Sequence, residues 1–335
     1  MTGNNISPPK SGRIVALGGG TGLSALLRGL RDFAPIPGQS GIFAVSDLAA
    51  IVTVTDDGGS SGRLRRDYSV LPPGDIRNCI AALADDESSV ARAFQFRFHT
   101  GRGLRGHSMG NLFLAALSQV TGDFAGAVRQ TCELLRVHGR VLPSTVEDIS
   151  LEALMHDGRI VSAERHIAKA RGPVRRVKLS HHHPKPLPGN LETIANADLI
   201  VLGPGSLYTS VIPNLLVAGV AEAIAASRAK RVYICNLMTQ PGETPHFTAA
   251  DHVRAIFKHT KQQIFDWVIL NHRVPCGAVV ERYRKQGAEP VKNDVEAIQR
   301  FGLKCVMDEL LEEHGVIRHN SGRLARLILD EFLLR

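Results

Sequence analysis

Short runs of apolar residues alternate along the chain with segments in which apolar residues recur every three to four positions. The continuous runs predict strands buried on both faces, and the periodic segments predict amphipathic helices. Strands that alternate with helices in this way indicate βαβ units and a mainly parallel sheet. The expected strands are residues 13–17, 50–54, 197–202, 231–235 and 267–270, and the expected helices begin near Leu23, Asp75, Asn111 and Asn214, with Asp75 as an N-cap.

This alternation continues through both halves of the chain without an internal repeat. We therefore expect an α/β fold in which residues 13–335 form one domain with loop and C-terminal excursions. Residues 1–12 contain no apolar h-region, which indicates a flexible tail and not a signal peptide. The longest apolar run, 215–226, is interrupted by Glu222 and is too short to span a bilayer, so we expect a cytoplasmic protein.

Composition narrows the classes of partner. The 335 residues are 44% hydrophobic, which is enough for a large core, and the formal net charge of +8 favours anionic partners. Aromatic residues make up only 5%, and no nucleic-acid-binding motif is present, so nucleic acid is not an expected partner. The five cysteines lie far apart without metal-ligand or disulfide spacing, and we expect them to be reduced and mostly buried.

A glycine loop, Gly18-Gly-Gly-Thr-Gly22, stands between the first expected strand and helix. Glycines there allow the backbone to approach a phosphate at the helix N-terminus. The loop fits a GxGxxA dinucleotide fingerprint, but it lacks the acid expected about twenty residues later, and it lacks the Lys of a phosphate-binding P-loop. We expect Gly19, Gly20, Thr21 and Gly22 to bind a ligand, with a tight turn without ligand as the alternative.

The segment TDDGGSSGRLRR, residues 55–66, follows the second expected strand. Its acids should stand at the ligand-binding edge of the sheet, and the loop 58–62 can present amides to an anion. A flexible solvated loop is the alternative. The candidate residues are Asp56, Asp57, Gly59, Ser60, Ser61 and Arg65.

The segment GHSMG, residues 106–110, has the GxSxG form of a hydrolase nucleophile elbow. Such an elbow must follow a buried strand, but the preceding residues are polar and rich in glycine, so Ser108 is not expected to be a nucleophile. His107 and Asn111, at a helix start in a basic loop, suit an anionic ligand better. A solvated basic loop is the alternative.

A second loop, residues 203–210, repeats the arrangement of the first. It follows the strand that ends at Leu202 and precedes the helix expected from Asn214, and the polar loop 236–244 should lie at the same edge of the sheet. Two such loops suggest a diphosphate or two ligands; a capped turn is the alternative. The candidate residues are Gly203, Pro204, Gly205, Ser206 and Thr209.

Six ordered motifs together resemble the YvcK family of gluconeogenesis factors, within the CofD-like superfamily named after 2-phospho-L-lactate transferase. Met109 and the segment 161–166 depart modestly from the family pattern. The resemblance implies a Rossmann-like three-layer fold, a cytoplasmic location, UDP-sugar binding and a role in carbon metabolism and cell-envelope morphogenesis. The motifs are GGGTGL (18–23), TDDGGSSGRLR (55–65), LPPGDIRN (71–78, with Asn78 as a ligand-binding candidate), GHSMGN (106–111), LGPGSLYTSVIPNLLV (202–217) and NLMTQPGET (236–244).

Tyr283 and Arg318 lie in segments that resemble the family's C-terminal pattern. A nucleotide base could stack on the tyrosine while the arginine grips a diphosphate. A surface tyrosine and a solvated arginine are the alternative.

Two functions follow from the resemblance. In the favoured one, the protein is a regulator that binds a nucleotide sugar resembling UDP-N-acetylglucosamine, signals to a cell-wall synthesis protein and controls cell shape. In the other, it is a transferase with a nucleotide diphosphate donor, in which Asp57 coordinates Mg²⁺ and Asp56 orients the acceptor hydroxyl. A homodimer is left open.

Overall fold

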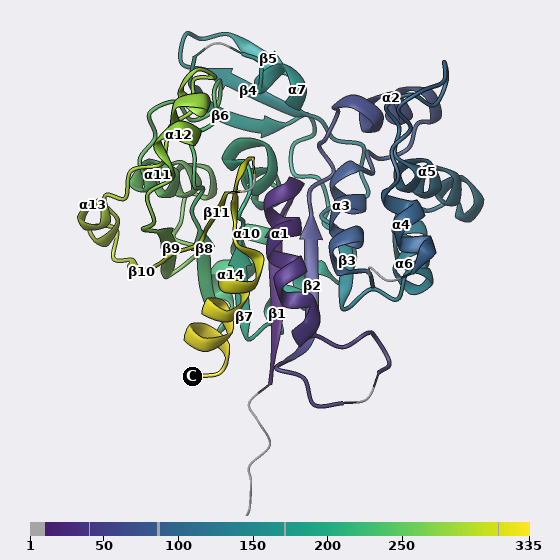
Figure 1. Ribbon diagram of the computed structural model, residues 1–335, viewed down its shortest axis with the longest axis horizontal. Helices are drawn as coiled ribbons and strands as arrows, with labels where there is room; N and C mark the ends of the chain where they lie inside the picture. Colours follow the sequence, from purple (N-terminus) through teal and green to yellow (C-terminus); the bar gives the residue numbers. More distant parts are fainter. Residues whose placement is uncertain (1–10, 40, 86–87, 171, 314) are drawn as a thin grey trace, which may run out of the picture.

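The computed structural model describes residues 11–39, 41–85, 88–170, 172–313 and 315–335. Its centre is a seven-stranded sheet in the order β10-β9-β8-β7-β1-β2-β3 (Figure 1). Every pairing in this sheet is parallel, which confirms the α/β prediction. The strands are β1 (Gly12–Gly18), β2 (Val45–Val52), β3 (Arg140–Pro143), β7 (Leu199–Leu202), β8 (Lys230–Ile234), β9 (Trp267–Asn271) and β10 (Lys304–Asp308).

The chain enters this sheet in the middle and then extends it in both directions. From β1 it proceeds to β2 and β3 on one side, and from β7 to β8, β9 and β10 on the other. Right-handed crossovers that move in opposite directions place their helices on opposite faces of the sheet. The continuous burial of β7 and of β1 from Ile14 onward agrees with a sheet covered on both faces.

Two groups of helices form the outer layers. In Figure 1, α1 lies in front of the sheet between α3 and α14, and it packs against both. On the other side α10 packs against α8 and α9, and α9 contacts α11. The bounds are α1 (Gly20–Leu30), α3 (Gly74–Leu83), α14 (Ser321–Ile328), α8 (Asn190–Ala195), α9 (Ile212–Leu215), α10 (Val220–Ala226) and α11 (Ala249–Thr260).

Smaller elements surround the carboxyl ends of the central strands. An antiparallel sheet in the order β5-β4-β6 lies with α7 at the top of Figure 1, and β11 pairs with β12 as a hairpin. The remaining elements are β4 (Leu151–Met155), β5 (Ile160–Ser162), β6 (Val174–Leu179), β11 (Leu311–Glu313), β12 (Ile317–His319), α2 (Gly59–Tyr68), α4 (Ser89–Gln95), α5 (Met109–Thr121), α6 (Phe124–Leu134), α7 (Glu164–Ile167), α12 (Gly277–Arg284), α13 (Val295–Gln299), η1 (Arg31–Phe33), η2 (Leu207–Val211) and η3 (Leu329–Leu333).

Three local predictions were wrong. Residues 59–66, expected in a loop, begin helix α2, because Gly59 accepts a positive φ of 46° and the following residues continue as a helix. The helix expected from Asn214 begins at Leu207 with the π-helical turn η2, so Thr209 is helical. Asp75 is not an N-cap: Pro73 holds that position, and the Asp75 carboxylate instead accepts a hydrogen bond from the Gly20 amide.

The expected tail falls mostly outside the described residues, and the strand β1 already includes Gly12. The prediction of one domain over residues 13–335 remains a prediction. All five cysteines are free; Cys79 and Cys235 are buried, whereas Cys276 is exposed. Among the described residues, no single helix is long and apolar enough to cross a membrane, although the bent pair 207–215 and 220–226 passes by length and composition.

Candidate functional site

The two glycine loops meet where the strand order reverses, between β7 and β1. The Gly203 amide donates a hydrogen bond of 2.8 Å to the Leu17 carbonyl oxygen, which ties the ends of the two strands together. The buried Asn214 side chain donates to the Gly18 carbonyl oxygen over 2.9 Å and to that of Ser210 over 2.8 Å. Crevices at the carboxyl ends of strands that flank such a switch point are where open α/β sheets bind ligands.

Glycine is required at two positions of the first loop for different reasons. Gly20 has a φ of +63°, which disfavours any residue with a Cβ. At Gly22, a Cβ would stand 2.6 Å from the Pro204 carbonyl oxygen and 2.9 Å from the Gly205 nitrogen. The sequence therefore lets the N-terminus of α1 approach the backbone of the second loop closely.

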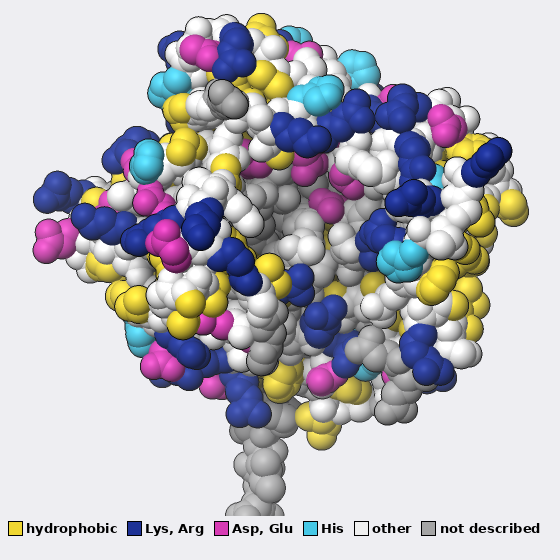
Figure 2. Space-filling view, turned by 45° about the horizontal axis from the view of Figure 1, so that its top comes forward, with side chains coloured by type: hydrophobic (Ala, Val, Ile, Leu, Met, Phe, Trp, Pro, Cys, Tyr) yellow, Lys and Arg dark blue, Asp and Glu magenta, His cyan; other side chains and the backbone are white. Residues whose placement is uncertain are grey.

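A cavity of about 420 Å³ opens between these loops. Figure 2 shows a central hollow with acidic side chains in its wall and Lys and Arg side chains around its rim. The loop after β8 closes one side, where Gln240 donates to the Ser206 hydroxyl over 2.5 Å. The predicted residues that line this cavity are Gly19, Gly20, Thr21, Gly22, Pro204, Gly205, Ser206, Tyr283 and Arg318.

Tyr283 and Arg318 reach the cavity from the C-terminal region. The Tyr283 hydroxyl accepts a hydrogen bond of 3.0 Å from the Ile317 amide, which fixes helix α12 to strand β12. Arg318 is the middle residue of β12 and is exposed, without a hydrogen-bond or ion-pair partner for its guanidinium among the described residues. The structure thus brings both residues to the glycine loops, from which they are far in sequence.

Acidic side chains form one wall of the cavity. Asp75 and Glu164 line it directly, and Asp56 lies close enough to act on both electrostatically. Burial, followed by the charge of Asp56, raises the pKa of Asp75 to about 7. Burial, and then the charges of Asp75 and Asp56, raise the pKa of Glu164 well above its usual value, and its Oε2 has no hydrogen-bond partner among the described residues.

The acid pair after β2 is held by backbone contacts. Asp56 accepts a hydrogen bond of 2.8 Å from the Gly58 amide and another from the Ser61 hydroxyl, while burial raises the pKa of Asp56. Asp57 Oδ1 accepts from the Arg165 amide over 3.0 Å. No three His, Cys, Asp or Glu side chains of the described segments are grouped closely enough to hold a metal ion, so a metal at Asp57 remains a prediction.

Other predicted residues lie away from the 420 Å³ cavity. The Ser60 hydroxyl is 2.8 Å from His107 Nδ1, and burial together with the nearby Arg63 lowers the pKa of this histidine. Arg65 forms an ion pair of 2.5 Å with Asp148.

Four further candidates are also outside this cavity. Asn111 accepts a hydrogen bond of 3.3 Å from Arg77 Nε. Thr209 is buried in η2, and Gly203 does not line this space. Asn78 lines a neighbouring cavity instead. The Ser108 hydroxyl accepts from the Asn111 amide over 3.2 Å as the N-cap of α5, and its lack of a nucleophilic role stays a prediction.

Sequence reasoning missed several residues at the site. Asp75 lies in the LPPGDIRN motif but was predicted as a helix N-cap, so its carboxylate was not expected in the wall of the cavity. Glu164 comes from the short helix α7 of the β5-β4-β6 region, and nothing in its neighbours distinguishes it from a surface glutamate. Arg28, on the exposed side of α1, carries the same lack of signal, although it lines a neighbouring cavity and not this one.

Comparisons with known proteins cover nearly the whole chain. The family model described as 2-phospho-L-lactate transferase CofD matches residues 14–311. The chain is similar to the gluconeogenesis factor of Bacillus subtilis, with 46% identity over 95% of this chain and 97% of that one. It is equally similar to the gluconeogenesis factor of Halalkalibacterium halodurans, with 46% identity over 96% of this chain and 97% of that one. A crystal structure of a Bacillus halodurans protein superposes with a TM-score of 0.90 and 46% identity, covering 96% of this chain and 100% of that one.

Proposed function

The chain belongs to the CofD family, and from that premise we propose that the cavity between its two glycine loops binds the diphosphate of a nucleotide sugar such as UDP-N-acetylglucosamine. The observation that carries this proposal is the convergence of two glycine loops, one helix N-terminus and Arg318 on one space. Proteins bind diphosphates with the backbone amides of glycine residues, with helix N-termini and with guanidinium groups.

The cavity size and its polar lining agree with such a ligand. A volume of about 420 Å³ falls within the range of pockets for small organic molecules. The Tyr283 ring offers a flat apolar face for a base, and the amides and hydroxyls of the loop after β8 can bind sugar hydroxyls.

We propose that binding makes the protein a cytoplasmic regulator of central carbon metabolism and of cell-envelope morphogenesis, and that it signals to a cell-wall synthesis protein. The gluconeogenesis factors of two bacilli, each 46% identical over almost the whole chain, support the metabolic part. The hydrogen bond from the Arg165 amide to Asp57 Oδ1 supports a binding role, because that oxygen already holds the first turn of α7.

Thermal unfolding in the presence of ligands tests this function. The protein is heated with UDP-N-acetylglucosamine, GDP or NAD, each with and without Mg²⁺. We expect UDP-N-acetylglucosamine to raise the melting temperature, since a ligand at 100 times its Kd stabilises the folded state by about 2.7 kcal/mol. A shift with GDP and Mg²⁺ alone, followed by turnover, would refute the regulator.

The acidic wall favours a second function, a transferase that uses a nucleotide diphosphate donor. Asp56 and Asp57 follow β2 beside Asp75 and Glu164, whose pKa values are raised by burial and by repulsion among these carboxyl groups. A divalent cation such as Mg²⁺, which prefers oxygen ligands, would relieve that repulsion. The ion would neutralise charge on the diphosphate, with Asp57 among its ligands, while Asp56 orients the acceptor hydroxyl. Two measurements on Asp57→Asn test this role. A group-transfer assay measures turnover, and a titration in Mg²⁺ measures nucleotide affinity; unchanged affinity contradicts the metal assignment.

A further inference from the structure

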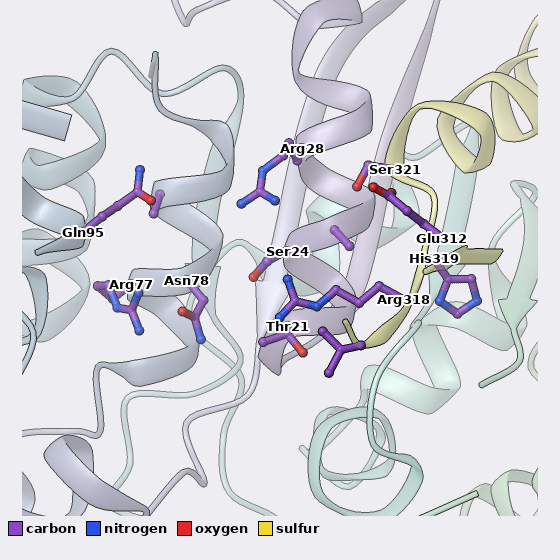
Figure 3. A pocket seen from close by; sticks show the side chains of 13 residues that line it. Thr21, Ser24, Arg28, Arg77, Asn78, Gln95, Glu312, Arg318, His319 and Ser321 are labelled. Atoms are coloured by element: carbon purple, nitrogen blue, oxygen red, sulfur yellow. The ribbon is translucent and has the colours of Figure 1, made fainter. Parts of the chain in front are cut away.

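A second cavity, of about 220 Å³, lies beside the first along helix α1. The two cavities share Thr21, Ala25, Arg318 and His319 as lining residues, so they are neighbours. Figure 3 shows Arg28, Arg77 and Arg318 around the space of the second cavity, on three separate segments. The three guanidinium groups meet only because α1, α3 and β12 pack around the same space, and none of these segments needs an arginine at this position in order to form.

The partners of these arginines leave much of their charge unmatched. Arg77 Nε donates to Asn111 Oδ1 over 3.3 Å, and burial followed by repulsion from Arg97 lowers the pKa of Arg77. Attraction to the charges of Asp75 and Asp56 opposes this shift, so part of the Arg77 charge is matched. Arg28 and Arg318 have neither a hydrogen-bond nor an ion-pair partner for their side chains among the described residues. Placing like charges around one cavity is unfavourable unless an anion occupies it.

Counting the charged groups of the lining indicates the charge of the occupant. Three arginines and one acid, Glu312, leave a net charge of 3 − 1 = +2. His319 does not add to this charge at neutral pH, because burial lowers its pKa to about 4. A dianion therefore matches the cavity.

Neutral groups complete a binding site for that dianion. Figure 3 shows the His319 imidazole on the side of β12 away from the three arginines, and it forms a hydrogen bond with the Cys235 backbone, so it borders the cavity without joining this group. Asn78 and Ser321 add an amide and a hydroxyl to the lining. The volume of about 220 Å³ is smaller than the ~300 Å³ at which pockets for drug-sized ligands begin.

We infer that Arg28, Arg77 and Arg318 form a binding site for the phosphate group of a small phosphorylated metabolite, separate from the glycine-loop cavity. Arginine suits this role because its planar fork binds phosphate oxygens in pairs. The inference goes beyond the proposed function and does not require that a nucleotide sugar binds next door. Because Arg318 lines both cavities, occupation of one site is expected to affect the other.

Calorimetric titration of the full chain with inorganic phosphate tests the site through Arg28→Gln. Arg28 is exposed and lines only the second cavity, so this variant is expected to fold. We expect its phosphate affinity to fall at least ~10-fold, which corresponds to about 1.4 kcal/mol. Arg129→Gln, on the exposed face of α6, makes the same change in net charge and should leave phosphate affinity unchanged.

The same titration with UDP-N-acetylglucosamine separates this inference from the proposed function. Loss of phosphate affinity in Arg28→Gln with retained nucleotide-sugar affinity supports a separate site. If no nucleotide sugar binds but Arg28→Gln still weakens phosphate binding, the second site stands and the proposed function fails. Equal phosphate affinity in Arg28→Gln and the unmodified protein overturns the inference, as does an equal loss in Arg129→Gln. If phosphate and UDP-N-acetylglucosamine compete and Arg28→Gln weakens the binding of both, the two cavities form a single site for one ligand, which also overturns the inference.

Discussion

The close approach of the two glycine loops makes Gly22→Ala a test in which helix propensity and packing predict opposite signs. Gly22 lies in the first turn of α1, where alanine is favoured over glycine by about 1 kcal/mol. The added Cβ would stand 2.6 Å from the Pro204 carbonyl oxygen, 2.8 Å from its carbon and 2.9 Å from the Gly205 nitrogen. All three are backbone atoms, so no flexible side chain can move aside.

Overpacking of this kind typically costs about 1–3 kcal/mol, and contacts with backbone place Gly22→Ala in the upper part of that range. After the gain in propensity, we expect a net loss of about 1–2 kcal/mol in the free energy of unfolding. An unfolding entropy of about 2.1 cal/mol/K per residue gives roughly 0.7 kcal/mol/K for 335 residues. The melting temperature should therefore fall by about 1.5–3 °C.

Thermal unfolding and nucleotide-sugar titration measure both consequences of Gly22→Ala. The loops must separate to admit the methyl group, so affinity for UDP-N-acetylglucosamine should fall with stability. Gly103→Ala is the control, because its Cβ meets no atom within 4 Å and its φ is not positive. A Gly22→Ala protein as stable as the unmodified one, with unchanged affinity, would refute the packing argument.

Three further changes test other parts of the structure. Burial raises the pKa of Asp75 from 3.8 to about 7, so the free energy of unfolding should decline as the pH rises through that interval. Asp75→Asn removes this charge, so its free energy of unfolding relative to the unmodified protein should be about 2 kcal/mol more favourable at pH 8 than at pH 5, measured by denaturant unfolding. Tyr283→Phe leaves the Ile317 amide without its acceptor and should lower the free energy of unfolding by about 1 kcal/mol, with no loss contradicting the contact. Ser108→Ala removes the cap on the Asn111 amide and should cost about 1 kcal/mol in thermal unfolding; an unchanged melting temperature would contradict the capping role.

The central strands were predictable because they are buried on both faces. Val201 and Ile234 sit in runs with no polar alternation, so length and β-branching identify them. The edge strands β3 and β10 were missed, since Arg140–Pro143 and Lys304–Asp308 mix polar and apolar residues at half-buried positions. These segments are strands because they pair with a neighbouring strand, and the local sequence pattern does not reveal that pairing.

The site was predictable only where backbone chemistry leaves a local mark. Glycine at positions 20 and 22 signals a positive φ or a close approach, and the structure confirms both. Glu164 and Arg28 carry no such mark, because an acid or a base on a short amphipathic segment reads as solvated surface. Their roles depend on which distant segments fold against them, and the direction of the Asp75 side chain depends on the Gly20 amide in the same way.

The seam between β7 and β1 has a consequence for the order in which the protein becomes competent. The Asn214 side chain that joins the two loops reaches a carbonyl oxygen 196 positions earlier in the chain, and the ion pair between Arg13 and Asp198 spans 185 positions. Contacts of such sequence separation form late, because the intervening loop must first close. Most of the chain must therefore be synthesised before the two loops can hold a ligand. A bound ligand then links the N-terminal segment of the chain to the segment that contains the second loop.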